Sequence, residues 1–318
     1  MCEVAVATTG FFDGVHLGHR RVIDTLVSRA REEGREAVVV TFWPHPRAVL
    51  QQDARSLRLL TTLEEKKERL LALGVDRVEV LPFSRKFAAL TAADYIKLLK
   101  EKFNVTMLVM GYDNHIGCDH KTARDFSGAK QALFAPDQSG FGNSGAKQAL
   151  LAPDPGLLVV PSAHEPVFAP ESVRPVSSSL IRSVLVDGRV EDAAEMLGYN
   201  YTMKGAVVAG NKLGRTLGFP TANMRLYEPL KLVPGKGVYA VDVEVLGQHF
   251  KGMTNVGTRP TVGGRTLSVE THILDFDEDI YGLPIKISFR RRVRDEINFG
   301  TLEALKEQLA ADALNCKK

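Results

Sequence analysis

Apolar segments alternate with amphipathic segments through the first 125 residues, and this alternation restricts the possible folds more than any other feature of the chain. Strands are predicted at Val4–Ala7, 36–44, 75–83 and 105–111, and helices at 19–31, 62–74 and 91–104. Buried apolar strands that alternate with helices are typical of a parallel sheet with helices on both faces. The first part of the chain is therefore predicted to be a Rossmann-like α/β domain.

The pattern changes from about Tyr201 onward. Segments 237–247, 267–276 and 284–293 read as strands separated by turns rich in Gly and Pro, which is typical of a small antiparallel barrel or sandwich. Residues 301–315 have the pattern of a closing helix. A length of 318 residues also suits two domains. We therefore predict one domain at 1–199 and a second at 200–318.

Composition limits the classes of partner and compartment. A formal net charge of only +3 gives no basis for nucleic-acid binding, and no apolar run is long enough to span a bilayer. Cys2, Cys118 and Cys316 are far apart, and the N-terminus lacks the pattern of a signal peptide. These features predict a cytoplasmic protein; they give no oligomeric state.

The stretch TTGFFDGVHLGHRRV, from Thr8 to Val22, joins the first predicted strand to the first predicted helix. In parallel sheets, ligands bind beyond the C-terminal ends of the strands. The turn Gly10–His19 and the segments 43–46 and 111–113 all follow strands, so we expect them to lie together.

Two histidines mark the start of that helix. His16 and His19 are three residues apart, so they share one face, and glycines at 10, 14 and 18 allow a ligand to approach the backbone closely. Helix N-termini favour phosphate, and two imidazoles there are suited to stabilising charge during group transfer. The alternative is a histidine pair that merely caps a turn or lies on the surface.

A second glycine-rich stretch, GNKLGRTLGFPTANM, precedes the predicted barrel strands. Gly210, Gly214 and Gly218 predict a loop that covers phosphates with backbone N–H groups. Thr221 and Asn223 point the same way in an extended segment, and their oxygens suit Mg²⁺ bound with nucleotide phosphates. The alternative is an ordinary Pro-Thr turn.

Glu270 lies in the middle of the predicted strand LSVETHIL. Alternation along the strand places Glu270 and His272 on its less apolar face. The spacing alone leaves open the alternative that Glu270 is an ordinary carboxylate in contact with solvent.

Several ordered motifs resemble those of bacterial bifunctional riboflavin kinase/FAD synthetases. GFFDGVHLGH is similar to the family motif Gly-x-Phe-Asp-Gly-x-His-x-Gly-His. The resemblance continues through TFWPHP, SSSLIR, GRTLGFPTAN, NVGTRPT, VETHILDF and YG over nearly the whole chain. It implies a nucleotidyltransferase domain that converts FMN and ATP to FAD, and a kinase domain that converts riboflavin and ATP to FMN.

The resemblance also implies residue roles. Glu270 would be the base acting on the ribityl 5′-hydroxyl of riboflavin, and Thr221 and Asn223 would bind Mg²⁺. His16, His19 and Arg182 would act on the ATP phosphates in the conversion of FMN to FAD. Further ATP or phosphate contacts are implied at Gly10, Phe12, Asp13, Gly14, Gly18, Asp113, Ser178, Gly210, Gly214 and Gly218.

One segment departs from the family pattern. The family has Gly-x-Asp-x-Arg-Phe-Gly where this chain has GYDNHIG, so His115 and Ile116 replace an arginine and a phenylalanine. Residues 127–137 then recur almost unchanged at 144–154, which remains unexplained. Two alternatives follow: a riboflavin kinase with a degraded first domain, and a flavin-binding or regulatory protein without catalysis. His115, Cys118 and His120 also raise the alternative of a zinc site, although their spacing matches no standard motif.

Overall fold

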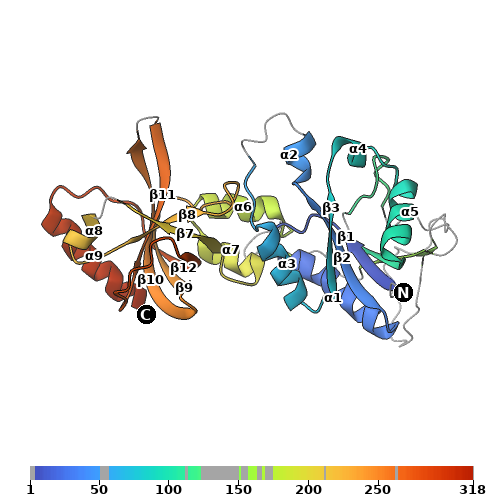
Figure 1. The fold of residues 1–318 in the computed structure, drawn as a ribbon, viewed down its shortest axis with the longest axis horizontal. Coiled ribbons are helices and arrows are strands. Elements are labelled where there is room, and N and C mark those ends of the chain that lie inside the picture. The colour runs from blue at the N-terminus through green and yellow to red at the C-terminus, as the bar shows by residue number, and fades with distance from the viewer. Residues whose placement is uncertain are drawn as a thin grey trace, which may run out of the picture. The chain divides into compact units, whose positions relative to one another are not determined.

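A computed structural model describes residues 4–50, 57–111, 114–122, 150–151, 157–162, 167–168, 175–210, 213–261 and 264–317. These residues form two compact units (Figure 1). The first comprises residues up to 57 and 63–167, and the second comprises 58–62 and 168–318. Residues 58–62 join the second unit because Leu59 exchanges backbone hydrogen bonds with Leu230 and Leu232, each 2.8 Å long.

The first unit is an α/β domain built on a six-stranded sheet in the order β3-β2-β1-β4-β6-β5. All neighbouring pairs are parallel except β5 with β6. In chain order its elements are β1 (Ala5–Thr9), α1 (Leu17–Glu32), β2 (Glu36–Trp43), α2 (Pro46–Leu50), α3 (Leu63–Ala72), β3 (Arg77–Pro82), α4 (Arg85–Ala88), α5 (Ala92–Phe103), β4 (Val105–Met110), β5 (Leu150–Leu151) and β6 (Leu158–Pro161).

Helices cover both faces of this sheet, as the continuous apolar strands predict. On one face, Val38 and Leu108 pack with Leu99 of α5. On the other face, Val39 packs with Ile23 of α1 and with residues of α3. Because successive strand residues point to opposite faces, a strand buried on both sides must be apolar throughout.

The second unit contains a closed six-stranded barrel in the order β10-β11-β8-β7-β12-β9. Of the two predicted alternatives, a barrel and a sandwich, the structure therefore shows the barrel. The unit contains α6 (Ser178–Val186), α7 (Val190–Leu197), β7 (Thr202–Val208), α8 (Leu213–Thr216), β8 (Ala222–Leu226), β9 (Gly237–Val245), β10 (Gln248–Thr261), β11 (Gly264–Ile273), β12 (Pro284–Arg294) and α9 (Leu302–Lys317).

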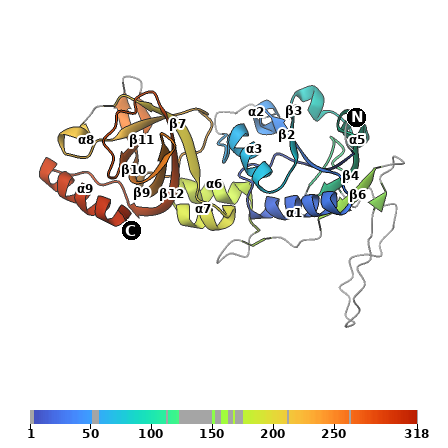
Figure 2. The ribbon, with the colours of Figure 1, turned by 60° about the horizontal axis from the view of Figure 1, so that its bottom comes forward.

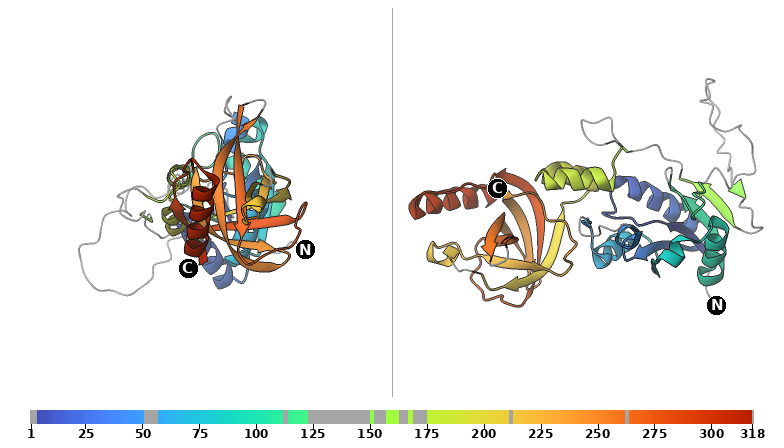
Figure 3. Two further views of the ribbon diagram at one scale, coloured as in Figure 1. Left: turned by 90° about the vertical axis from the view of Figure 1, so that its left-hand side faces the viewer. Right: turned by 90° about the horizontal axis from the view of Figure 1, so that it is seen from above.

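Three helices pack on this barrel. Figure 2 shows α6 and α7 side by side next to β12, and Figure 3 shows α9 along the barrel, where it contacts β9 and β10. Arg292 of β12 joins the helix pair to the barrel, because its guanidinium donates to the carbonyl of Asp187 at 2.8 Å. By packing, α6 and α7 therefore belong with the barrel. The domain division predicted at 199/200 stays a prediction.

The helix boundaries agree with the local signals in the sequence. Thr91 caps α5 as predicted, and its hydroxyl accepts a hydrogen bond from the backbone N–H of Asp94. Ser177 caps α6 in the same way. The first helix begins at Leu17, two residues before the predicted start, because His16 is its N-cap.

Candidate active sites

The turn after β1 lies at the C-terminal edge of the first sheet, where the sequence predicts three segments to meet. The backbone N–H of Gly10 donates to the carbonyl of Val40 at 3.1 Å. The ring of Phe11 lies 3.9 Å from that of His45, and the amide of Asn114 donates to the carbonyl of Thr9 at 2.7 Å. The predicted convergence is confirmed for the described residues; Asp113 lies outside them.

His16 and His19 form a stacked pair at the start of α1. Their ring centroids are 3.7 Å apart with an interplanar angle of 19°. His16 is buried, and its Nδ1 accepts the backbone N–H of His19 at 3.4 Å. One histidine therefore caps the helix while both rings remain at its positive N-terminal end. The predicted alternative of a capping pair is compatible with a phosphate site, because the cap formed by His16 positions the ring of His19.

The backbone of the turn is unusual. Phe12, Gly14 and Val15 have φ values of 51°, 82° and 40°, in the left-handed region that residues other than glycine seldom adopt. Phe12 and Val15 tolerate this conformation because both are anchored in the core on one face of the sheet. The ring of Phe12 packs edge-on against His19 at 5.2 Å. Phe12 therefore fixes the position of His19. The ATP or phosphate contact implied for Phe12 stays a prediction.

A buried lysine lies beside this turn, and sequence reasoning did not identify it. Lys66 of α3 is fully buried, and its Nζ lies 3.6 Å from the centroid of the Phe11 ring. The same atom donates to the hydroxyl of Thr41 at 3.4 Å, and that hydroxyl donates to the carbonyl of Phe11. In the sequence Lys66 is one of several charged residues of an amphipathic helix, so nothing marked it.

Burial sets the protonation states of His19 and Lys66. Burial lowers the pKa of His19 well below its ordinary value, and the nearby His16 and Lys66 lower it further. Burial also lowers the pKa of Lys66 to about 8, an effect that Asp13 opposes. At neutral pH the region therefore holds a neutral His19 beside a largely protonated Lys66. Nδ1 of His19 is buried without a hydrogen-bond partner among the described residues.

Two residues expected to share this site belong to the second unit. Ser178 is the first residue of α6, and Arg182 lies one turn later with its Nε donating to the carbonyl of Arg58 at 2.7 Å. Ser177, rather than Ser178, provides the cap. Their shared role with the histidines stays a prediction.

In the barrel, strand register brings three polar residues into one row. Glu270 of β11 lies directly opposite Asn223 of β8 on one side and Asn255 of β10 on the other. Residues directly opposite each other in antiparallel strands project from the same face, with Cβ atoms about 5 Å apart. The predicted placement of Glu270 on the less apolar face of its strand is therefore confirmed. Asn255 stands in the NVGTRPT segment, but no spacing related it to Glu270 in advance.

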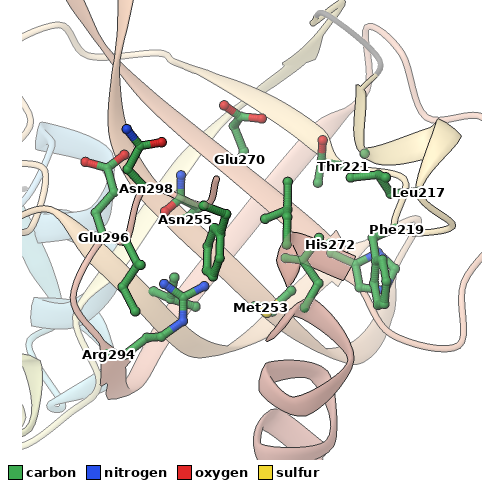
Figure 4. A pocket seen from close by; sticks show the side chains of 16 residues that line it. Leu217, Phe219, Thr221, Met253, Asn255, Glu270, His272, Arg294, Glu296 and Asn298 are labelled. Carbon is green, nitrogen blue, oxygen red and sulfur yellow. The ribbon is translucent and has the colours of Figure 1, made fainter. Parts of the chain in front are cut away.

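Glu270 lines a cavity of about 370 Å³ (Figure 4). Figure 4 shows Glu270 and Thr221 at one end of the view, with Asn255 and Asn298 beside them, and Met253 toward the opposite end. The apolar part of the wall is formed by Leu217, Phe219, Val238, Met253, Ile297, Phe299, Leu305 and Leu309. The cavity thus combines a broad apolar wall with a polar end, an arrangement suited to a flat ring system carrying a polar chain.

An arginine of the basic run 290–294 lines the same cavity. The sequence leaves open which of these arginines contributes. Arg294 is the one at the cavity, and its guanidinium pairs with the buried carboxylate of Asp312 on α9 at 2.7 Å. Arg291 and Arg292 instead donate to backbone carbonyls of Asn315 and Asp187. The choice depends on how α9, the next element in the chain, packs against β12.

A second cavity of about 570 Å³ adjoins β11 from its other face. Glu270 and His272 line the first cavity, whereas Thr271 and Ile273 line the second. Thr221 lines both. The second cavity also includes Arg215 of the glycine-rich segment. Strand β11 therefore separates two spaces that meet at Thr221.

The described part of the glycine-rich segment contains a short helix. Residues 213–216 form the single-turn helix α8, and Gly218 has φ +86°. A Cβ placed on Gly210 would lie 2.1 Å from Nδ2 of Asn223, so only glycine allows this approach. Gly210 is therefore required for the contact with Asn223, whereas the predicted phosphate contact of the segment stays a prediction.

Among the described residues no group of three or more His, Cys, Asp and Glu side chains is placed to hold a metal ion, so the zinc alternative at 115–120 has no support. No helix in the described part of the chain is both long enough and apolar enough to cross a membrane.

Comparison with known proteins assigns each unit to a family. The FAD synthetase family matches residues 2–134, and the riboflavin kinase family matches residues 197–318. The bifunctional riboflavin kinase/FMN adenylyltransferase of Bacillus subtilis (strain 168) is 35% identical over 97% of this chain and 90% of its own. The protein of the same name from Escherichia coli (strain K12) is 36% identical over 99% of this chain and 93% of its own. A crystal structure of a Streptococcus pneumoniae protein named as a macrolide-efflux protein has a TM-score of 0.84 at 31% identity, covering 100% of this chain and 95% of that one.

Proposed function

The chain belongs to the family of bifunctional riboflavin kinase/FMN adenylyltransferases, and on that premise we propose which residues carry out each of its two reactions. In the first reaction riboflavin and ATP give FMN and ADP. In the second, FMN and ATP give FAD and pyrophosphate. The kinase reaction is assigned to the cavities beside β11, and the adenylyl transfer to the turn after β1.

Glu270 is the proposed base of the kinase reaction, and the observation that carries the assignment is its place in the first cavity, which shares Thr221 with the second cavity. The apolar first cavity suits the flavin ring, and the second cavity, which Arg215 lines together with Asp277, Glu278 and Asp279, is the proposed place of the nucleotide and its bound cation. The ribityl 5′-oxygen attacks the γ-phosphorus of ATP, its proton passes to the Glu270 carboxylate, and ADP leaves. The phosphoryl group is then transferred beside Thr221, the residue that both cavities share.

Thr221 and Asn223 are the proposed Mg²⁺ ligands. The side chain of Asn223 is buried in a cradle that a Cβ on Gly210 would fill, and Asn223 lies in the same row as Glu270. Hydroxyl and amide oxygens suit a hard cation that keeps most of its ligands from water and phosphate. When bound, Mg²⁺ neutralises charge on the phosphates. Addition of excess chelator should therefore stop FMN formation.

The turn after β1 is the proposed phosphate site of the adenylyl transfer. The stacked histidines lie at a helix N-terminus, where backbone N–H groups and the helix dipole favour anions. His19 is kept neutral, so it donates a hydrogen bond without giving up a proton to the ligand. The site stabilises negative charge on the pyrophosphate as it leaves. The proposed location is the cytoplasm, where ATP is available.

The substitution Glu270→Gln tests the kinase assignment. It preserves shape but removes the proton acceptor, so FMN formation should fall by about 10²- to 10⁴-fold. FAD formation from supplied FMN should be unchanged, because it is assigned to the other unit. Riboflavin, FMN and FAD are separated by chromatography after incubation with ATP and Mg²⁺. Full FMN formation by the variant would exclude Glu270 as the base.

A further inference from the structure

A histidine two residues after Glu270 makes a contact that the kinase mechanism above does not use. Nδ1 of His272 lies 2.8 Å from the carbonyl oxygen of Pro220. Because a carbonyl can only accept, Nδ1 carries the proton and donates it. The His272 ring also packs edge-on against Phe219, with ring centroids 5.3 Å apart. One side chain of β11 therefore contacts both members of the Phe219–Pro220 pair; Figure 4 shows His272 beside Phe219.

This contact begins where the regular ladder between two strands ends. β8 and β11 pair at Glu270 with Asn223 and at Thr271 with Ala222, and no further pair of these strands is found in the described residues. Proline has no N–H with which to extend the ladder. Beyond this point the imidazole of His272 donates to the carbonyl of Pro220 and ties the segment before β8 to the sheet.

The segment held in this way carries the residue at the junction of the two cavities. Thr221 follows Pro220 directly and lines both spaces, while His272 lines only the first. A displacement of Pro220 would move Thr221 relative to Glu270. Misplacement of reacting groups by about 1 Å is enough to slow a reaction substantially.

We propose that His272 is a positioning residue of the kinase reaction, which holds Pro220 so that Thr221 stays at the junction of the nucleotide and flavin cavities. The proposal rests on the assignment of the kinase reaction to these cavities. It requires that His272 act through Pro220 and Thr221 rather than through contact with the transferred phosphoryl group. Loss of one neutral hydrogen bond predicts an effect of about 3- to 10-fold, far smaller than loss of the base.

Two substitutions separate the hydrogen bond from the volume of the ring. His272→Leu fills similar space without a donor. In His272→Asn the side-chain Nδ2 is attached to Cγ, as Nδ1 is in histidine, so it can donate to the same carbonyl. We measure kcat for FMN formation, the Mg²⁺ concentration that gives half-maximal rate, and riboflavin affinity by flavin fluorescence. Riboflavin binding, which is assigned to the barrel, checks that the second unit of each variant is folded, and FAD formation from FMN in the same samples checks the first unit.

The expected result is a 3- to 10-fold lower kcat and a higher Mg²⁺ requirement in His272→Leu, with riboflavin affinity within about 2-fold of the original. His272→Asn should recover most of both losses. Equal loss in both variants, or a normal Mg²⁺ requirement in His272→Leu, would overturn the proposal. Glu270→Gln is measured alongside: if it keeps full activity, the site assignment itself fails. If it loses activity while His272→Leu behaves as the original, only the role of His272 fails.

Discussion

The turn after β1 and the cavities beside β11 are both assigned to ATP phosphates, yet they are built from different parts. The turn is one continuous stretch, Gly10–His19, that leads into the N-terminus of α1. The barrel site joins Thr221, Asn255 and Glu270, which come from separate segments and meet through strand register. The first region offers imidazoles and a nearby ammonium to a leaving pyrophosphate. The second offers a carboxylate to a hydroxyl that must lose its proton.

The comparison teaches that the charge at each site matches the chemistry proposed for it. Adenylyl transfer expels an anion, so a site with Lys66 and a helix N-terminus suits it. Phosphorylation of an alcohol needs a proton acceptor and a cation at the phosphates, so a carboxylate beside hydroxyl and amide oxygens suits it. Variants in one region should therefore leave the other reaction intact.

In the first unit, the strongest test of whether the two reactions are independent is the replacement of His19. His19→Ala should lower FAD formation from FMN on the order of 10²-fold, because it removes a donor at the developing charge. FMN formation should be retained. His249→Ala, which changes an exposed histidine of β10, serves as the matched control. Loss of both reactions in His19→Ala would break the comparison, since it would mean that the sites are not independent.

A smaller effect is expected at Gly210 in the second unit. In Gly210→Ala the new methyl would lie 2.1 Å from Nδ2 of Asn223, so one of the two must move. Overpacking of this kind costs about 1–3 kcal/mol, and we expect FMN formation to fall about 10-fold with a higher Mg²⁺ requirement. Gly300→Ala is the control, since its Cβ would meet nothing within 4 Å. Identical Mg²⁺ titrations for the two variants would argue against Asn223 as a ligand.

Lys66 gives a prediction on stability, which is measured separately from FAD formation. The folded lysine loses its proton near pH 8, whereas the unfolded one keeps it to about pH 10.5. Between these values the unfolded state binds more protons, so the free energy of unfolding contributed by Lys66 rises with pH. Burial of the ammonium is therefore most costly at pH 7. Its pH-dependent part is on the order of 3 kcal/mol.

The substitution Lys66→Met should accordingly stabilise the protein more, or destabilise it less, at pH 7 than at pH 10. Denaturant unfolding at the two pH values measures the difference. Lys97→Met, at an exposed position of α5, is the control and should show no such dependence. If the two variants respond alike to pH, then Lys66 keeps an ordinary ammonium in the folded state.

Part of this organisation could be predicted because its signals are local. The strand–helix alternation of the first unit, the cap at Thr91 and the helix start beside the histidines all depend on neighbours within a few residues. The face of β11 that carries Glu270 follows from the two-residue period of a strand. The departure at 111–117 was equally plain in the sequence, although its Asp113 lies outside the described residues.

The sequence by itself determined the two kinds of domain, the family and most of the candidate residues, because periodicity, capping and ordered motifs are properties of short stretches. Only the tertiary structure decided that the barrel closes, that Asn255 and Asn223 flank Glu270, that Arg294 is the arginine at the cavity, and that Lys66 is buried beside Phe11. Each of these depends on contacts between residues far apart in the chain. Such contacts are fixed by strand register and by the packing of helices, which a linear pattern does not specify.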